Sequence, residues 1–217
     1  MQILLRKFLK RLAGSSGIVR KWREARFRKF CELIVVPAGA RIIDLGGTIY
    51  NWEIVPNDFH ITIVNLPGIN ENNENTEKYK FVTADATDLS SLFSDKSFDV
   101  AYSNSVIEHV GNDANVEKFA NEVKRLGKAY WVQTPSKKFP IEPHSGVPFF
   151  WYFPSSLRMK LIDRWEKELP AWTAMIRGTR LITEEHMKSL FPDAAIYYEN
   201  KLGFFEKSYS YYKPYQK

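Results

Sequence analysis

The chain of 217 residues is long enough for one domain with a full-sized core, and 44% of its residues are apolar, which fits a soluble globule. No stretch approaches the roughly 18 apolar residues of a membrane span, so we expect no transmembrane helix. The net charge of +6 is uneven: residues 1–30 hold ten Lys or Arg and one acid, whereas the rest carries −3. Cations on an arm rather than on the body argue against a nucleic-acid partner. The single cysteine, Cys31, excludes an internal disulfide, fits a reducing, cytoplasmic compartment, and is expected to be an apolar filler.

The first 34 residues predict two basic helices. Residues 1–12 place apolar side chains at helical spacing with cations between them, and a second basic segment runs from about residue 18 to residue 34. Three hypotheses stay open for this arm. Both helices pack on the body, or residues 1–30 bind anionic lipid on the inner membrane face, or the arm is an organelle transit peptide. We therefore separate a basic arm, 1–34, from a catalytic domain, 35–217.

Four apolar runs follow the arm, and each ends in polar residues, as expected of buried parallel strands that lead to a binding edge. The first, residues 40–43, ends in Asp44-Leu45-Gly46-Gly47, where glycine permits a sharp turn and close backbone approach. The other three runs are His60–Asn65, Tyr79–Asp85 and Ser97–Ser105. Their polar ends recur roughly every 20 residues, the interval of strand, connection and strand in a nucleotide-binding half-fold.

The remainder of the chain alternates between helices, strands and one irregular segment. Residues 135–182 are rich in proline and predict a lid over an acceptor site. Residues 49–55 are expected to form the first crossover helix or a loop in its place. Periodicity and capping residues further predict a helix from Asn112 to Gly127, a strand at 128–134, a helix at 155–169, a helix capped by Thr183, and strands at 194–202 and 204–212.

These strand ends, in this order and spacing, resemble the cofactor-binding edge of class I S-adenosylmethionine-dependent methyltransferases of the type 11 kind. The run Val106-Ile-Glu-His-Val110 is closely similar to the family signature after the fourth strand. The resemblance implies an α/β fold, with a Rossmann-like seven-stranded, mostly parallel sheet, helices on both faces and an antiparallel final strand. It also implies S-adenosyl-L-methionine as cofactor, with its methionine part held by Asp44, Gly46, Gly47 and Thr48, its ribose by Asn65 and Leu66, its adenine by Asp85 and Ala86, and the site closed by Asn104 and Ser105.

Two positions depart from the family pattern. Thr48 stands where a second glycine is usual, and Asn65 stands where an acid is usual. They motivate an alternative in which the chain binds the cofactor without turnover. A nicotinamide-dependent dehydrogenase is disfavoured, because residues 46–51 lack the glycine spacing that brings a pyrophosphate onto a helix N-terminus.

His109 and His144 are the candidate general bases, since imidazole titrates near neutral pH. His109 follows the fourth predicted strand, and His144 lies in the predicted lid. Each can instead be a structural residue that shapes the pocket. The loop Glu142-Pro-His144 and the aromatic run Phe149–Phe153 resemble a bacterial subgroup associated with glycan or lipid-linked biosynthesis. We predict O-methylation of a small-molecule, glycan or lipid-linked acceptor, with N-methylation of an amine or phospholipid as the alternative. No cluster has metal-ligand spacing, so no metal is predicted.

Overall fold

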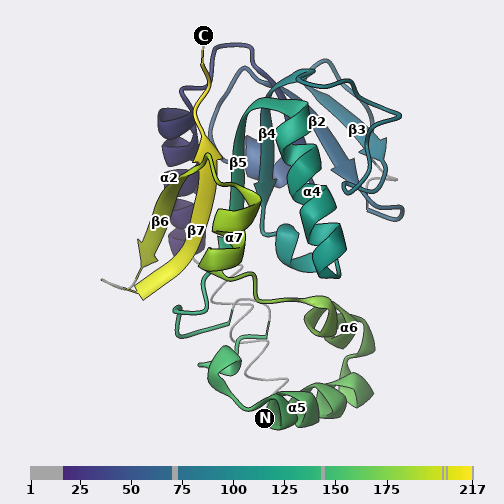
Figure 1. The fold of residues 1–217 in the computed structure, drawn as a ribbon, viewed down its shortest axis with the longest axis vertical. Coiled ribbons are helices and arrows are strands. Elements are labelled where there is room, and N and C mark those ends of the chain that lie inside the picture. Colours follow the sequence, from purple (N-terminus) through teal and green to yellow (C-terminus); the bar gives the residue numbers. More distant parts are fainter. Residues whose placement is uncertain (1–16, 70–72, 143–144, 202, 204, 217) are drawn as a thin grey trace.

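A computed structural model describes residues 17–69, 73–142, 145–201, 203 and 205–216. Its centre is a seven-stranded sheet in the order β3-β2-β1-β4-β5-β7-β6 (Figure 1). The strands are β1 (Arg41–Leu45), β2 (His60–Asn65), β3 (Tyr79–Thr83), β4 (Phe98–Asn104), β5 (Gly127–Pro135), β6 (Ala195–Lys201) and β7 (Phe205–Lys213). The α-helices are α2 (Gly17–Ile34), α3 (Ile49–Glu53), α4 (Asp113–Leu126), α5 (Ser155–Glu168), α6 (Pro170–Gly178) and α7 (Glu184–Leu190).

The direction of the strands confirms the predicted fold class. β1 pairs in parallel with β2 and β4, and the outer pairs β2–β3 and β4–β5 are parallel as well. β7 is antiparallel to both of its neighbours, β5 and β6. The carboxyl ends of the five parallel strands therefore lie at one edge of the sheet, where open α/β sheets bind their ligands.

Each face of the sheet is covered by helices because strand side chains alternate between faces. Ile42 packs with α2 and α3 on one face, in a core that includes Phe30 and Trp52. Its neighbour Ile43 packs with α4 and α7 on the other face, in a core that includes Phe119. Strands buried on both faces explain why the sequence shows apolar runs there rather than strict alternation.

Gly127 ends α4 as predicted. It does not form the left-handed cap that a glycine after a helix usually provides. Its φ of −95° is ordinary, and it is already the first residue of β5. A Cβ at this position would lie 2.5 Å from the backbone nitrogen of Ala101 on β4. The glycine is needed for the close approach of two strands.

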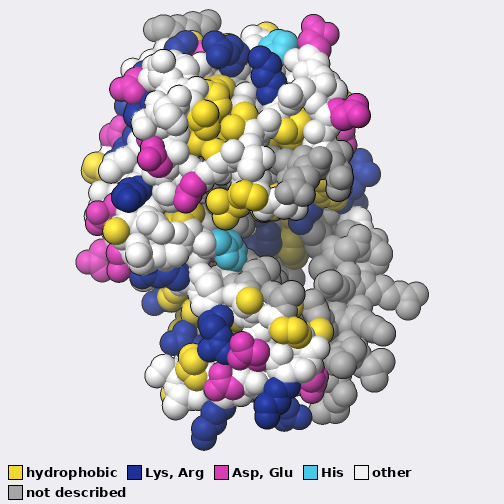
Figure 2. Space-filling view, turned by 90° about the vertical axis from the view of Figure 1, so that its right-hand side faces the viewer, with side chains coloured by type: hydrophobic (Ala, Val, Ile, Leu, Met, Phe, Trp, Pro, Cys, Tyr) yellow, Lys and Arg dark blue, Asp and Glu magenta, His cyan; other side chains and the backbone are white. Residues whose placement is uncertain are grey.

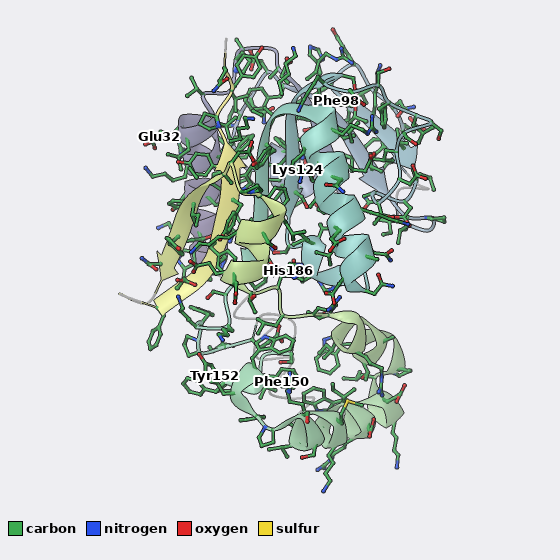
Figure 3. The ribbon with its side chains drawn as sticks, in the orientation of Figure 1. Glu32, Phe98, Lys124, Phe150, Tyr152 and His186 are labelled. Carbon is green, nitrogen blue, oxygen red and sulfur yellow. The ribbon has the colours of Figure 1, made fainter. Side chains whose placement is uncertain are left out.

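Residues 139–178 form a small lobe off the carboxyl edge of the sheet (Figure 1). It has its own aromatic core, in which the ring of Trp165 lies 6.2 Å from Phe150 and 5.2 Å from Trp172. Figure 3 shows Phe150 within this lobe and Tyr152 at its edge. The prediction of one helix at 155–169 was incomplete, because Pro170 does not end the helical structure. It occupies the first position of α6, where a missing N–H costs nothing.

The described part of the basic arm packs on the body. Phe27, Phe30 and Ile34 of α2 are buried against the sheet, so the apolar face of this helix is not available to a lipid surface. The predicted helix at 1–12 lies outside the described residues. Among those that are described, no helix has the length and apolar character needed to cross a bilayer.

Candidate functional site

The glycine turn lies directly against the end of β1. The prediction that the strand stops before Asp44 was wrong by two residues, since β1 continues through Leu45 and Asp44 lies within the sheet. Gly46 has a φ of +79°, and a Cβ on it would lie 2.6 Å from a methyl of Val106. A Cβ on Gly47 would lie 1.6 Å from the Asp44 carboxylate. Both glycines are therefore required for steric reasons, and the turn wraps around a carboxylate.

Asp44 is a fully buried acid in an incompletely satisfied environment. Its Oδ2 accepts a hydrogen bond of 2.7 Å from the indole N–H of Trp52, whereas Oδ1 has no hydrogen-bond partner among the described residues. Burial raises the pKa of Asp44 to about 7, and the Trp52 hydrogen bond only partly opposes this shift. Thr48, the next polar residue of the turn, is exposed and precedes α3 without a side-chain capping bond.

The end of β2 is tied to the same turn. The side-chain amide of Asn65 is buried and donates a 2.8 Å hydrogen bond to the carbonyl of Gly47. The backbone of Gly46 donates a 2.8 Å bond to Val64. The following residue, Leu66, is 54% exposed at the edge of the sheet. Asn65 therefore has a structural role that an acid could not perform, because a carboxylate has no proton to donate to a carbonyl.

The end of β3 forms a turn on the surface. Oδ1 of Asp85 accepts hydrogen bonds from the backbone and the hydroxyl of Thr87, at 2.9 and 2.8 Å. Asp85 is exposed and Ala86 is half-buried against the core. The backbone N–H of Ala84 donates 2.9 Å to the carbonyl of Asn65, which joins this turn to the end of β2.

The end of β4 carries Asn104 and Ser105. Ser105 has a φ of +58°, uncommon for a residue with a side chain. Its hydroxyl donates to Oε1 of Gln133 at 2.9 Å, and its N–H donates to the Gln133 carbonyl at 3.0 Å. Oδ1 of Asn104 accepts a 2.6 Å hydrogen bond from Arg26. These bonds fix a strained segment at the predicted edge.

Arg26 belongs to a buried polar cluster that the sequence analysis missed. Its Nε lies 2.6 Å from Oε2 of Glu199, and both side chains are almost inaccessible to solvent. Ser208 donates a 2.9 Å bond to the same oxygen, and Lys207 lies 3.8 Å from the other one. The cluster connects α2 and β6 with the end of β4, elements that are far apart in the sequence. The one available signal was an arginine at an inward-facing position of an otherwise apolar helix face.

His109 lies in a short 3₁₀ turn, Ile107–His109, that follows β4. It is half-buried, and its Nδ1 lies 3.3 Å from the hydroxyl of Thr179, just after α6. The second predicted base, His144, lies outside the described residues. Figure 3 shows a further histidine, His186 of α7, at the end of the helix that faces the small lobe.

Glu108, next to His109, joins both connections of the small lobe to the body. Its side chain is buried and accepts a 3.0 Å hydrogen bond from Thr134 near the end of β5, the connection that leads into the lobe. Its carbonyl accepts 2.8 Å from the N–H of Arg180, in the connection that leads out. Arg180 also bonds the carbonyl of Gly111 and the carboxylate of Asp113. In the space-filling view, the surface is hollowed where the body meets the lobe (Figure 2).

The polar ends of the parallel strands thus meet at one edge, as the sequence predicted. Direct contacts connect Asp44 with Gly47, Gly47 with Asn65, and Gly46 with Val106. This edge offers features that a cationic nucleoside can use: a buried carboxylate oxygen without a partner, and glycines that keep the turn free of side chains. The residues present therefore fit S-adenosylmethionine, whose amino group and sulfonium are positively charged.

A second depression, of about 450 Å³, lies at the opposite edge of the sheet. It is lined by residues of α2 and by the loops before β1 and β2, and none of the predicted site residues line it. Cys31 is part of its wall, and burial raises the pKa of this thiol to about 11. The thiol therefore stays protonated at neutral pH, in keeping with a packing role. Within the described ranges, no group of three or more His, Cys, Asp or Glu residues is placed to hold a metal ion.

Residues 46–129 match the family model described as a methyltransferase domain. The matched stretch begins in the glycine turn and ends in β5. Two uncharacterized proteins of Mycobacterium tuberculosis are 24% identical to the chain over 153 residues, which is 64% of this chain and 48% of theirs. The chain thus spans about half the length of the curated relatives it matches.

Solved structures of methyltransferases share the fold. A SAM-dependent methyltransferase from Archaeoglobus fulgidus aligns with a TM-score of 0.59 at 12% identity, covering 95% of this chain and 98% of that one. Phosphoethanolamine N-methyltransferase 2 of Haemonchus contortus, in complex with S-adenosyl-L-methionine, aligns with a TM-score of 0.50 at 12% identity. The alignment covers 81% of this chain and 38% of that one. The CurJ carbon methyltransferase aligns with a TM-score of 0.51 at 12% identity, covering 86% of this chain and 51% of that one. The family model thus covers the stretch from the glycine turn to β5, and these solved structures show that the chain has the fold of S-adenosylmethionine-dependent methyltransferases.

Proposed function

We propose that the chain methylates a hydroxyl of a small-molecule, glycan or lipid-linked acceptor, bound between the carboxyl edge of the sheet and the small lobe. The observation that carries this proposal is the position of His109. It follows β4 at the predicted cofactor edge and contacts Thr179 at the connection to the lobe. A base at this junction can reach an acceptor that lies between the two parts.

The cofactor supplies an electrophilic methyl group, and the residues of the chain bind and align it. We assign Asp44 to the positively charged methionine part, because its unpartnered oxygen is the buried anion nearest to the glycine turn. We assign Asp85 and Ala86 to the adenine, and Leu66 with the backbone around Asn65 to the ribose. Thr48 would lie at the mouth of the turn, and Asn104 and Ser105 would form the wall of the site.

His109 acts as a base in one tautomer of its ring. When the proton is on Nδ1 and is donated to Thr179, Nε2 is left with a lone pair. That nitrogen would accept the proton of the acceptor hydroxyl, which makes the hydroxyl oxygen more nucleophilic. Thr179 thereby has a positioning role, since its hydroxyl accepts the Nδ1 proton in this tautomer and holds the ring in place.

The test uses S-adenosylmethionine labelled on its methyl group and two acceptor pools, a glycolipid extract rich in hydroxyls and phosphatidylethanolamine vesicles. We expect label in the hydroxyl pool. His109→Gln should lower turnover by about 10²- to 10⁴-fold while calorimetric binding of S-adenosylmethionine changes less than about twofold. Thr179→Val is the matched control and should lower turnover by a smaller factor.

Each alternative has its own outcome in the same experiment. Label confined to phosphatidylethanolamine would replace O-methylation with N-methylation. Tight binding of S-adenosylmethionine and S-adenosylhomocysteine with no label in either pool would favour a binding module without turnover. If neither compound binds, the assignment of the strand ends to this cofactor is wrong.

A further inference from the structure

The tip of the small lobe exposes apolar and cationic side chains together. Tyr152 is 60% exposed, Leu157 43% and Met159 45%, and Phe149 packs its ring 6.4 Å from that of Tyr152 while remaining about half exposed. All four lie within eleven residues of the chain, two of them just before α5 and two in its first turns. Single exposed apolar residues are common on soluble proteins, but a cluster of this size indicates a contact surface.

The cations of α5 lie beside this cluster. Lys160, Arg164 and Lys167 are exposed, and Leu157, Lys160 and Arg164 share one side of the helix because they are spaced by three and four residues. Figure 1 shows α5 at the end of the molecule farthest from the sheet, and Lys and Arg side chains project from that end in Figure 2. The surface is therefore accessible to a flat partner.

Two of the acids on α5 pair with one cation of the neighbouring helix. Asp163 and Glu166 of α5 both pair with Arg177 of α6, at 3.2 and 2.7 Å. Residues 139–178 carry five basic and four acidic residues, a net charge of +1, whereas the chain after residue 30 is −3 in total. The lobe is therefore net positive although the chain after residue 30 is net negative, and an acidic partner would be attracted to it.

We propose that the lobe tip, defined by Tyr152, Leu157, Met159, Lys160 and Arg164, docks on an anionic lipid surface. Aromatic and aliphatic side chains enter the headgroup boundary, and the adjacent cations meet lipid phosphates. The inference goes beyond the proposed reaction and does not depend on the identity of the acceptor.

Sedimentation of the full chain with phosphatidylcholine vesicles, with and without phosphatidylglycerol, tests the proposal. We expect binding only to the anionic vesicles. Lys160→Gln with Arg164→Gln should weaken it about 30-fold, since each cation near such a surface is worth about 1 kcal/mol. Leu157→Ser with Met159→Ser should weaken it about tenfold or more. The matched control, Lys80→Gln with Lys118→Gln, removes the same charge from exposed positions of the body and should change binding less than about twofold.

All variants keep residues 1–16, so the contribution of that segment is constant. Urea midpoints equal to that of the unsubstituted chain will show that the variants are folded. A second readout is quenching of tryptophan fluorescence by brominated lipid, which Trp151→Phe should reduce. Equal binding to neutral vesicles, or lobe variants that bind like the unsubstituted chain, would overturn the proposal. So would a loss of self-association in the lobe variants, which would assign the tip to a second copy of the chain.

Discussion

Asp44→Asn should stabilise the protein without cofactor and weaken its cofactor binding. The carboxyl is fully buried, and burial raises its pKa from 3.8 to about 7. A difference of about three pKa units corresponds to an order of 4 kcal/mol between the two protonation states. The amide retains an oxygen that can accept the Trp52 hydrogen bond but carries no charge to desolvate.

The sign of the pH dependence follows from the direction of the shift. Because the folded pKa is raised, the folded state binds more protons than the unfolded state between about pH 4 and pH 7. The contribution of the Asp44 carboxyl to the free energy of unfolding is therefore fully present below pH 4 and is lost as pH rises through 7. The advantage of Asp44→Asn should be absent near pH 4 and reach about 1–4 kcal/mol above pH 7.

Urea denaturation at a series of pH values measures this difference, and calorimetry measures the functional cost. We expect at least a tenfold loss of S-adenosylmethionine affinity, since a buried charge pair would be removed. Binding to the wild type near pH 6 should release a proton, seen as a dependence of the binding enthalpy on the buffer. If Asp44→Asn is destabilised equally at pH 5 and pH 8, the carboxyl is not under strain in the free protein. If it binds the cofactor normally, Asp44 does not contact it.

Asp99→Asn provides the opposite control. Burial opposes ionisation of Asp99, but hydrogen bonds from Lys128 and from the Arg41 backbone outweigh it and lower its pKa. The folded pKa is depressed, so the stability from this group is present above the unfolded pKa and is lost as pH falls. Asp99→Asn should therefore be destabilised at neutral pH and approach the wild type in acid, the reverse of Asp44→Asn.

Two further substitutions test the scaffold around the site. Gly47→Ala would place a methyl 1.6 Å from the Asp44 carboxylate. We therefore expect urea denaturation to show a loss of about 1–3 kcal/mol in the free energy of unfolding, and calorimetry to show a loss of cofactor binding. Gly178→Ala is the control, because its methyl would meet nothing within 4 Å and should change neither quantity. Arg26→Met leaves Glu199 buried without its main partner and should cost about 3–5 kcal/mol, and Arg26→Met combined with Glu199→Met should recover most of that loss. A double variant as unstable as the single one would show that the cluster stabilises through packing rather than charge.

The parallel half of the sheet could be predicted from the sequence because its signals are local. The bounds of β2 were predicted to the residue, and the caps at Asn112 and Thr183 were both confirmed. Asn and Thr side chains bond backbone N–H groups two or three residues ahead, so their effect can be read within one turn of helix.

The features that were missed depend on contacts between distant segments. Arg26 and Glu199 are separated by 173 residues, and nothing near either position reveals the pairing. The role of Asn65 as a donor to Gly47 was likewise invisible, because the substitution of an acid by an amide could be read only as a departure. In the small lobe, α6 was missed because the predicted helix ended at residue 169, and the proline that follows is the first residue of another helix.

The attachment of the small lobe through Glu108 bears on how acceptor preference can change. Both connections of the lobe bond this one residue, and the aromatic core of the lobe is separate from the two cores of the sheet. Insertions or exchanges within residues 139–178 would therefore leave the strand ends undisturbed as long as Thr134 and Arg180 are kept. A fold divided in this way can change its acceptor by replacing the small lobe while the strand ends of the sheet stay the same.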